Sequence, residues 1–453
     1  MAETVDVVVV GLGVGGEEVA GRLAEAGLRV VGVEGRLVGG ECPYWGCVPS
    51  KMMIRAGNAL AEARRVPELA GTADVTADWA PVARRVRDEA TDSWDDKVAV
   101  DRLVGKGVTF VRGWARVTGR SEVTVGDRVF HATRGIVIGT GTEPAVPPID
   151  GLADTPLWTN REAIEVATLP GALIVLGGGA IGVELAQVFA RFGVAVTVVE
   201  AADRLVALEE PESSDVAQAA LVRDGVTVHA GVSATSVRHD AGRFTVALAD
   251  GRSVTAEQLL VATGRKVDLS KLGVEHLGLD ASARSIAVDD RMRAADRVWA
   301  VGDVTGHGAF THMAMYQAGI AIRDILGQDG PPADYRATPR VTFTDPEIGA
   351  VGLTEAQARE AGMSVRVGTA QVSSSSRGWI HKAGNEGFIK LVEDTSRGVL
   401  VGATSAGPAG GEVLSALTVA VHAAVPVETL RHMIYAYPTF HRGIEDALRD
   451  LRA

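Results

Sequence analysis

The hydrophobic pattern of the chain repeats one plan twice. Residues 5–10 form an apolar, β-branched run that predicts a buried strand, and a glycine-rich turn and a helix-periodic run follow at once. A second apolar run, 28–33, predicts the next strand. The same order of strand, glycine turn and helix begins at 172–176, and its second strand is 194–199. Two copies at a period of about 160 residues predict two similar βαβ domains.

The first glycine turn has the spacing of a dinucleotide-binding unit. By its spacing, Gly11 is expected to make the tight turn, Gly13 to let the backbone approach a pyrophosphate, and Gly16 to allow close helix packing. Glu34, at the end of the second strand, is placed to bind a ribose hydroxyl. An ordinary tight turn is the alternative, but the two strands and the acidic residue favour dinucleotide binding.

The second turn carries the same elements in Gly177, Gly179, Gly182 and Glu200. Two dinucleotides in one chain suggest a relay, in which one is held permanently and the other exchanges. The remaining patterns predict helices within 57–105 and antiparallel strands on either side of Gly126-Asp127.

Domain boundaries follow from these patterns and from proline-rich joints. We expect a first nucleotide domain over 1–150, a second over 151–265, a return to the first over 266–334, and an α+β domain over 335–453. The predicted fold class is α/β, with two Rossmann-like domains and a C-terminal α+β domain that covers another part or pairs with a second subunit.

The only two cysteines, Cys42 and Cys47, lie five residues apart. Pro49 fits the first turn of a helix, so Cys47 is expected at a helix N-terminus, where the dipole lowers a thiol pKa. Residues five apart on one helix lie too far apart for a disulfide, so Cys42 is expected in the loop of Gly39 and Gly40. The pair suggests redox chemistry; two unrelated buried thiols and a zinc site are the weaker alternatives.

Composition restricts the partners and the compartment. The net charge of −12 argues against binding nucleic acid or an anionic membrane. No apolar stretch reaches the length of about 18 residues that a membrane span requires, and the N-terminus has no signal-peptide pattern. We therefore expect a cytoplasmic protein, where a lone cysteine pair is more often catalytic than structural.

Together these motifs make the chain resemble the pyridine nucleotide-disulfide oxidoreductases, the family of dihydrolipoamide dehydrogenase, glutathione reductase and mercuric reductase. Nearly the whole chain takes part in the resemblance. The segments that carry it are 11–16 with Glu34, 40–51, 177–182, Ala262-Thr263-Gly264-Arg265, Ala300-Val301-Gly302-Asp303 and 343–349.

The resemblance implies an FAD in the first domain and a nicotinamide nucleotide in the second. It implies that Cys47 lies against the flavin, that Cys42 is the interchange thiol, and that Lys51 pairs with Glu184 near the flavin. Without the family, Glu184 would be assigned to a solvated helix face, and Asp303 to a turn cap. Further cofactor-binding residues that it implies are Gly40, Glu41, Lys51, Gly141, Gly264 and Asp303.

In the expected electron path, NAD(P)H reduces the flavin, the flavin reduces the cysteine pair through Cys47, and Cys42 attacks the acceptor. Glu200 favours NADH over NADPH, because a carboxylate there binds a 2′-hydroxyl and repels a 2′-phosphate, although Arg204 is nearby. The resemblance also implies a homodimer, because the family builds its active site across two subunits.

The C-terminal segment departs from the family pattern. Relatives that reduce disulfides carry a His-Pro and a Glu five residues after the His, whereas this chain has Tyr437-Pro438 and Arg442. A phenol is a poor base at neutral pH, and a guanidinium accepts no hydrogen bond. Mercuric reductases replace that His by Tyr but add a C-terminal cysteine pair, which is missing here. His441 is a possible substitute, though a structural His is the simpler interpretation.

Three hypotheses follow. The first is a flavin disulfide reductase in which Tyr437 or water replaces the base. The second is an NAD(P)H-dependent quinone or metal-ion reductase that needs no proton delivery by His. The third is a non-catalytic flavoprotein, which both glycine turns and the intact cysteine pair disfavour. No metal site is expected.

Overall fold

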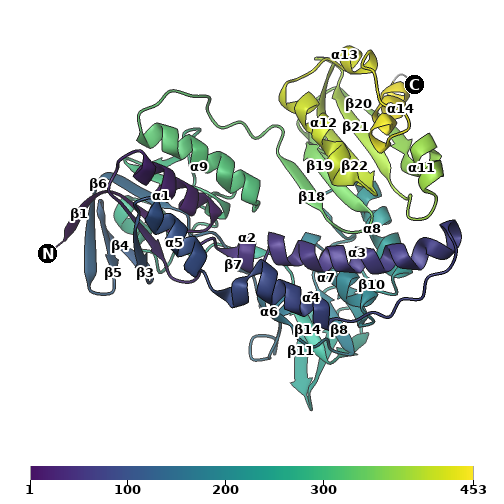
Figure 1. Cartoon of the computed structure of the whole chain (residues 1–453), viewed down its shortest axis with the longest axis horizontal. Helices are drawn as coiled ribbons and strands as arrows, with labels where there is room; N and C mark the ends of the chain where they lie inside the picture. Colours follow the sequence, from purple (N-terminus) through teal and green to yellow (C-terminus); the bar gives the residue numbers. More distant parts are fainter. Residues whose placement is uncertain (1, 452–453) are drawn as a thin grey trace. The chain divides into compact units, whose positions relative to one another are not determined.

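The computed structural model of the protein describes residues 2–451 (Figure 1). The chain forms two compact units, each built from three segments. The first unit contains the residues up to 49, 84–145 and 265–335, and the second contains 50–83, 146–264 and the residues from 336 onward. The four domain boundaries expected above stay predictions.

The first unit is built on an eight-stranded sheet of order β16-β17-β6-β1-β2-β3, with β4 and β5 joined to it as an antiparallel extension of β6. Its strands are β1 (Glu3–Val10), β2 (Val30–Glu34), β3 (Thr109–Arg112), β4 (Ala115–Gly119), β5 (Glu122–Val125), β6 (Arg128–Ile138), β16 (Arg293–Ala295) and β17 (Val298–Ala300). The expected hairpin at Gly126-Asp127 joins β5 to β6, with Val125 opposite Arg128.

Strand β1 is apolar throughout because both of its faces are covered. Val8 and Val10 belong to a core on the side of β4 and β5. Val7 and Val9 belong to the opposite core, which is closed by α1 (Val14–Glu25), α5 (Lys97–Gly105) and α9 (Thr311–Ile325). Two-sided burial explains why the sequence shows a continuous apolar run and no alternation.

The second unit repeats the strand, turn and helix plan in a four-stranded parallel sheet of order β10-β9-β8-β14. An antiparallel three-stranded sheet, β11-β12-β13, shares a core with it through Phe244 and Val246. The elements are β8 (Ala172–Leu176), α7 (Ala180–Arg191), β9 (Ala195–Val199), α8 (Pro211–Arg223), β10 (Thr227–His229), β11 (Ala234–Asp240), β12 (Arg243–Leu248), β13 (Ser253–Ala256) and β14 (Gln258–Val261).

The C-terminal part of the second unit is an antiparallel five-stranded sheet of order β18-β19-β22-β21-β20 with helices packed on it. Its strands are β18 (Pro339–Thr342), β19 (Glu347–Gly352), β20 (Val365–Gln371), β21 (Phe388–Asp394) and β22 (Val399–Gly407). Its helices are α10 (Glu355–Glu360), α11 (Ser376–His381), α12 (Gly410–His422), α13 (Val427–Arg431) and α14 (Gly443–Asp450). The predicted α+β character of this region is confirmed.

The expected helical stretch 57–105 is only partly helical. The long helix α3 (Cys47–Leu69) ends before Gly71, whose φ of +132° interrupts the helix. Helix α4 (Ala80–Arg85) follows and continues into a π-helical turn, Val86–Ala90, and a short turn with positive φ at 92–94 precedes α5. No helix within 2–451 combines the length and apolar character that crossing a membrane requires. The α/β fold class with parallel sheets is confirmed.

Candidate active site

Both glycine turns have the backbone conformation and the close packing that a dinucleotide site requires, and the approach of Gly13 and Gly179 to a pyrophosphate stays a prediction. Gly11 has φ +87°, and a Cβ on it would lie 2.6 Å from the Gly139 carbonyl oxygen. A Cβ on Gly16 would lie 2.0 Å from the Gly11 oxygen, so side chains are excluded at both positions. A Cβ on Gly13, the N-cap of α1, would meet only the Gly139 oxygen, at 4.0 Å, so this side of the helix N-terminus has room where a pyrophosphate would bind.

The second turn has the same geometry. Gly177 has φ +108°, and a Cβ on it would lie 2.4 Å from the Ala262 oxygen. A Cβ on Gly182 would lie 2.0 Å from the Gly177 oxygen, whereas Gly179, the N-cap of α7, has nothing within 4 Å of a Cβ. The repeat therefore extends from the hydrophobic pattern to the atomic detail of the turn.

The first of the two carboxylates spans its glycine turn. Glu34 accepts the backbone N–H of Leu12 on Oε2 at 2.8 Å and that of Arg36 on Oε1 at 2.7 Å. These two bonds hold the carboxylate against the turn, where a ribose hydroxyl can donate to its remaining lone pairs.

Glu200 spans the second turn in the same way. It accepts the N–H of Gly178 at 2.5 Å and that of Ala202 at 2.6 Å. Two glycine cradles with matching carboxylate forks fit two dinucleotides, and the ribose roles of Glu34 and Glu200 stay predictions.

Asp303 lies at the start of a short 3₁₀ helix, Asp303–Thr305, in a polar cluster of the first unit. Thr142 donates its hydroxyl to Asp303 Oδ2 at 2.9 Å, and Arg265 Nε lies 4.0 Å from the same oxygen. Arg265 also reaches Glu41, at 3.7 Å. Burial raises the pKa of Asp303, although Thr142 and Arg265 oppose the shift. A half-buried carboxylate with lone pairs to spare suits a hydroxyl-rich chain such as a ribityl group.

The remaining predicted glycines adopt conformations that favour glycine. Gly40 has φ +68°, and a Cβ on it would lie 2.9 Å from the Gly13 Cα, so this loop packs directly on the first turn. Gly141 and Gly264 have φ of +65° and +119°. The expected role of all three in cofactor binding stays a prediction.

The two cysteines lie on two successive helices. Cys47 is the first residue of α3, as expected, and it is exposed. The prediction that Cys42 lies in the Gly39-Gly40 loop is wrong, because Cys42 belongs to a one-turn helix, α2 (Glu41–Tyr44), that starts directly after this loop. A four-residue helix carries too little periodicity to be recognised from sequence.

Cys47 also meets the start of another helix, which the sequence reasoning missed. Its Sγ lies 3.3 Å from the Thr311 hydroxyl, and Thr311 is the first residue of α9. Residues 47 and 311 are far apart in sequence, so no local pattern signals the contact. The sulfur therefore lies at the positive ends of two helix dipoles, an environment that stabilises a thiolate.

Lys51 and Glu184 form an ion pair in the second unit, with Nζ and Oε2 2.7 Å apart. Glu184 is 6% exposed, so its assignment to a solvated helix face is wrong. Its second oxygen accepts the Phe343 N–H at 2.8 Å, and Lys51 Nζ lies 4.6 Å from the centre of the Phe343 ring. The ion pair, the Phe343 N–H and the Phe343 ring together hold the Lys51 ammonium group in one position.

Tyr437 is 66% exposed and precedes Pro438 in the C-terminal part of the second unit. The Arg442 guanidinium carbon lies 5.3 Å from the Tyr437 ring centre, and Arg442 pairs with Glu445 at 3.1 Å. The two residues that replace the expected His and Glu therefore contact each other. His441 lies beside Tyr435, with ring centres 6.3 Å apart.

Family comparisons agree with this geometry. The family model for pyridine nucleotide-disulphide oxidoreductases matches residues 5–318, and the model for the dimerisation domain of the same family matches 338–448. A dihydrolipoyl dehydrogenase of Haloferax volcanii is 33% identical over 473 residues, covering 99% of this chain and 96% of the relative. A mercuric reductase of Bacillus cereus is 31% identical, covering 93% of this chain and 67% of the relative.

Solved structures show the same architecture along the chain. The HOCl-induced flavoprotein disulfide reductase RclA from Escherichia coli is similar with a TM-score of 0.86 and 28% identity, covering 98% of this chain and 99% of that one. LpdA from Mycobacterium tuberculosis is similar with a TM-score of 0.86 and 26% identity, covering 99% and 100%. The C-terminal match to a dimerisation domain supports a homodimer. The chain belongs to the pyridine nucleotide-disulphide oxidoreductase family and is an FAD- and NAD(P)H-dependent oxidoreductase.

Proposed function

We propose that the protein reduces a small disulfide, using NADH as donor and Cys42 with Cys47 as the redox pair. FAD, when bound, carries two electrons from the nicotinamide to this pair. The Cys42 thiolate attacks one sulfur of the acceptor and releases the first thiolate product. The Cys47 thiolate then attacks the Cys42 sulfur, which forms the internal disulfide and releases the second product. Two protons from solvent complete the two thiol products.

The observation that carries this proposal is the position of Cys47 at the start of α3 and against the first residue of α9. A thiolate is the reactive form in disulfide exchange, and two helix N-termini favour it at neutral pH. A buried structural cysteine has no need of such an environment. We place the reaction in the cytosol, where a lone cysteine pair is more often catalytic than structural.

The preference for NADH is supported by the contacts of Glu200 and Arg204. Glu200 is held on the second turn, where it would repel a 2′-phosphate. Arg204, the nearby cation, donates to the Ser214 hydroxyl at 2.7 Å and to the Ala207 and Glu209 carbonyl oxygens at 2.8 Å. Three of its five N–H donors are engaged by these acceptors, which reduces its capacity to bind a phosphate.

Proton handling separates this chain from its relatives. We propose that Tyr437 or water takes the place of the usual His-Glu pair, because Tyr437 is exposed and Arg442 contacts its ring. Lys51 is held by Glu184 and is expected beside the flavin, as the family resemblance implies.

A second candidate is reduction of quinones or metal ions. It is favoured by the same replacement of His and Glu by Tyr437 and Arg442, because these acceptors need no proton from a His. Among the relatives are a mercuric reductase and an RclA structure described as a Cu(II) complex.

An anaerobic titration of the purified holoenzyme with NADH tests the proposal. A long-wavelength band from thiolate-to-flavin charge transfer at the two-electron stage is expected. Direct bleaching of the flavin without this band would refute a working cysteine pair. Replacing Cys42 by Ser should abolish turnover of disulfides, whereas quinone turnover that survives this change would favour the second candidate.

A further inference from the structure

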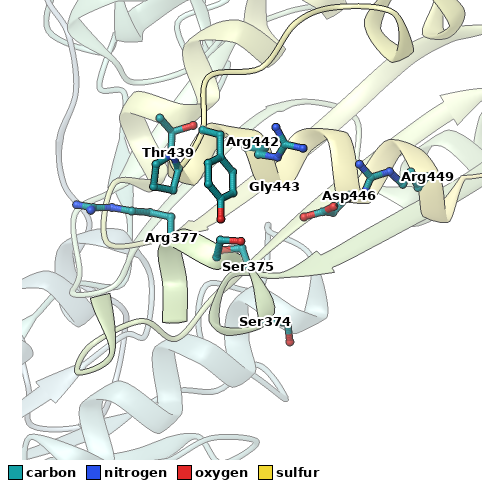
Figure 2. Close-up of a pocket in the computed structure, with 11 residues that line it drawn as sticks. Ser374, Ser375, Arg377, Thr439, Arg442, Gly443, Asp446 and Arg449 are labelled. Carbon is teal, nitrogen blue, oxygen red and sulfur yellow. Dashed lines mark hydrogen bonds and ion pairs between the residues drawn. The ribbon is translucent and has the colours of Figure 1, made fainter. Parts of the chain in front are cut away.

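The C-terminal part of the second unit contains a pocket of about 280 Å³ beside Tyr437. It lies between the segment that starts α11 and the segment that leads into α14 (Figure 2). In the figure, Arg377 lies on one side of Ser375, and Arg442, Asp446 and Arg449 lie on the other. The lining residues are Ser374, Ser375, Ser376, Arg377, Tyr437, Pro438, Thr439, Arg442, Gly443, Asp446 and Arg449.

The charged groups of the lining are mostly donors. Guanidinium groups only donate, and the lining has three of them and a single carboxylate, that of Asp446, whereas its hydroxyls can both donate and accept. This carboxylate is already engaged, because its Oδ1 lies 2.6 Å from Arg449 Nη1. The Ser375 hydroxyl is also engaged, since it donates to the Val372 oxygen and accepts the Gly378 N–H. A ligand that fills this pocket must therefore supply acceptors.

The charges of the arginines in the lining also favour a ligand that supplies acceptors. Arg442 and Arg449 share Glu445, at 3.1 and 2.7 Å. Arg377 has no carboxylate within 4.0 Å in the part of the chain that is described, and its guanidinium carbon lies 5.2 Å from the Phe440 ring centre. The cation–π contact holds the guanidinium group of Arg377 beside the Phe440 ring, and no carboxylate of the described residues neutralises its charge.

We propose that this pocket binds an oxyanion group, a carboxylate or a phosphate, of the electron acceptor, with Arg377 as its principal cation. The proposal rests on the proposed function, because the family resemblance implies that position 437 of one subunit serves the cysteine pair of the other. The exchange of Glu for Arg at position 442 changes the chemistry of this position from an acid that orients a base to a cation that attracts an anion.

Two aromatic disulfides that differ in charge test the proposal on the holoenzyme. Dithionitrobenzoate carries two carboxylates, and dithiodipyridine is uncharged near neutral pH. In the Arg377→Gln variant, kcat/KM for the dianion is expected to fall about tenfold relative to the neutral disulfide, as loss of one charge-assisted bond predicts. Arg377→Lys should retain part of the preference. Arg397→Gln, an exposed arginine in the turn between β21 and β22, is the matched control and should leave the ratio unchanged.

Added salt gives a second readout. Raising the ionic strength should reduce the preference of the wild-type enzyme for the dianion and have little effect on Arg377→Gln. An unchanged ratio in Arg377→Gln overturns the proposal, as does an equal loss with both disulfides, because that result would mean that Arg377 acts only through the fold.

Direct binding separates failure of the pocket from failure of the proposed function. If neither disulfide is turned over, the disulfide reductase function fails, and calorimetric titration of the holoenzyme with phosphate and with isophthalate still tests the pocket. Binding that is lost in Arg377→Gln supports the site, and the tighter of the two probes identifies the anion. If neither phosphate nor isophthalate gives a heat of binding, the proposed site is overturned.

Discussion

The buried ammonium group of Lys390 allows a quantitative prediction about stability. Lys390 lies on β21 with its side chain 4% exposed, and its Nζ lies 2.9 Å from oxygens of both Glu210 and Glu212 and 3.1 Å from Glu355. These carboxylates raise the pKa of Lys390 to about 12 against the opposing effect of burial, and the pKa of Glu355 is lowered by Arg359 and Lys390. The cluster joins the start of α8 to the C-terminal sheet within the second unit.

Replacing Lys390 by Met removes the one cation that all three carboxylates share. Removing one partner of a buried pair costs about 3–5 kcal/mol. Glu355 is 31% exposed, so water compensates its charge in part, whereas Glu210 is 3% exposed. The Glu212 side chain is 43% exposed, but its Oε2 is buried without a hydrogen-bond partner. We therefore expect the free energy of unfolding to fall by about 3 kcal/mol, with Glu210 as the largest contributor.

Thermal and urea unfolding of Lys390→Met and of Lys390→Met with Glu210→Gln measure this cost. The double variant should recover more than half of the stability lost. Protonation of the carboxylates relieves their repulsion in the variant, so its deficit should shrink as the pH falls from about 7.5 to about 5. The control is Arg397→Gln, which removes a cation at an exposed site in place of a buried one. A deficit below about 1 kcal/mol, or one that does not change with pH, would show that the cluster is solvated and would refute this reasoning.

Three further changes test the two nucleotide sites. Gly16→Ala places a Cβ 2.0 Å from the Gly11 oxygen and should abolish FAD retention in the absorbance spectrum, whereas Gly105→Ala, with open space around it, should retain FAD. Glu200→Ala should lower the NADH over NADPH ratio of kcat/KM about tenfold, and an unchanged ratio would assign discrimination to other residues. Burial raises the pKa of Asp303 above its usual value, so the charged carboxylate destabilises the apoprotein at a pH above that usual value. Asp303→Asn should therefore raise the Tm of the apoprotein at neutral pH. The same change should weaken FAD binding.

Local patterns predicted the elements that local interactions determine. The glycine turns, the strands that flank them and the helix that starts at Cys47 all follow from residues within a few positions of each other. Steric exclusion at Gly16 comes from the Gly11 oxygen five residues earlier, so its cause is local, whereas the exclusion at Gly11 comes from the distant Gly139. The one-turn helix that carries Cys42 is too short for any periodicity.

Contacts between distant segments could not be predicted from such patterns. Thr311 meets Cys47 because α3 and α9 begin at the same place, and Arg265 reaches Thr142 because β15 (Arg265–Lys266) pairs with β7 (Glu143–Pro144). Some local contacts were missed as well, because Arg204 donates to the carbonyl oxygens of Ala207 and Glu209, only three and five residues along the chain. The sequence shows which residue types are present, whereas tertiary packing determines which residues they contact.

The close packing of Gly40 on Gly13 has a kinetic consequence. The carboxylate forks of Glu34 and Glu200 are alike, so they do not account for the expected difference between a retained and an exchanging dinucleotide. At the first turn, Gly39 bridges Gly13, and a Cβ on Gly40 would lie 2.9 Å from the Gly13 Cα. If the first dinucleotide binds beneath this loop, its dissociation requires the loop to open, and we expect its residence time to depend on the chain segment that also carries Cys42.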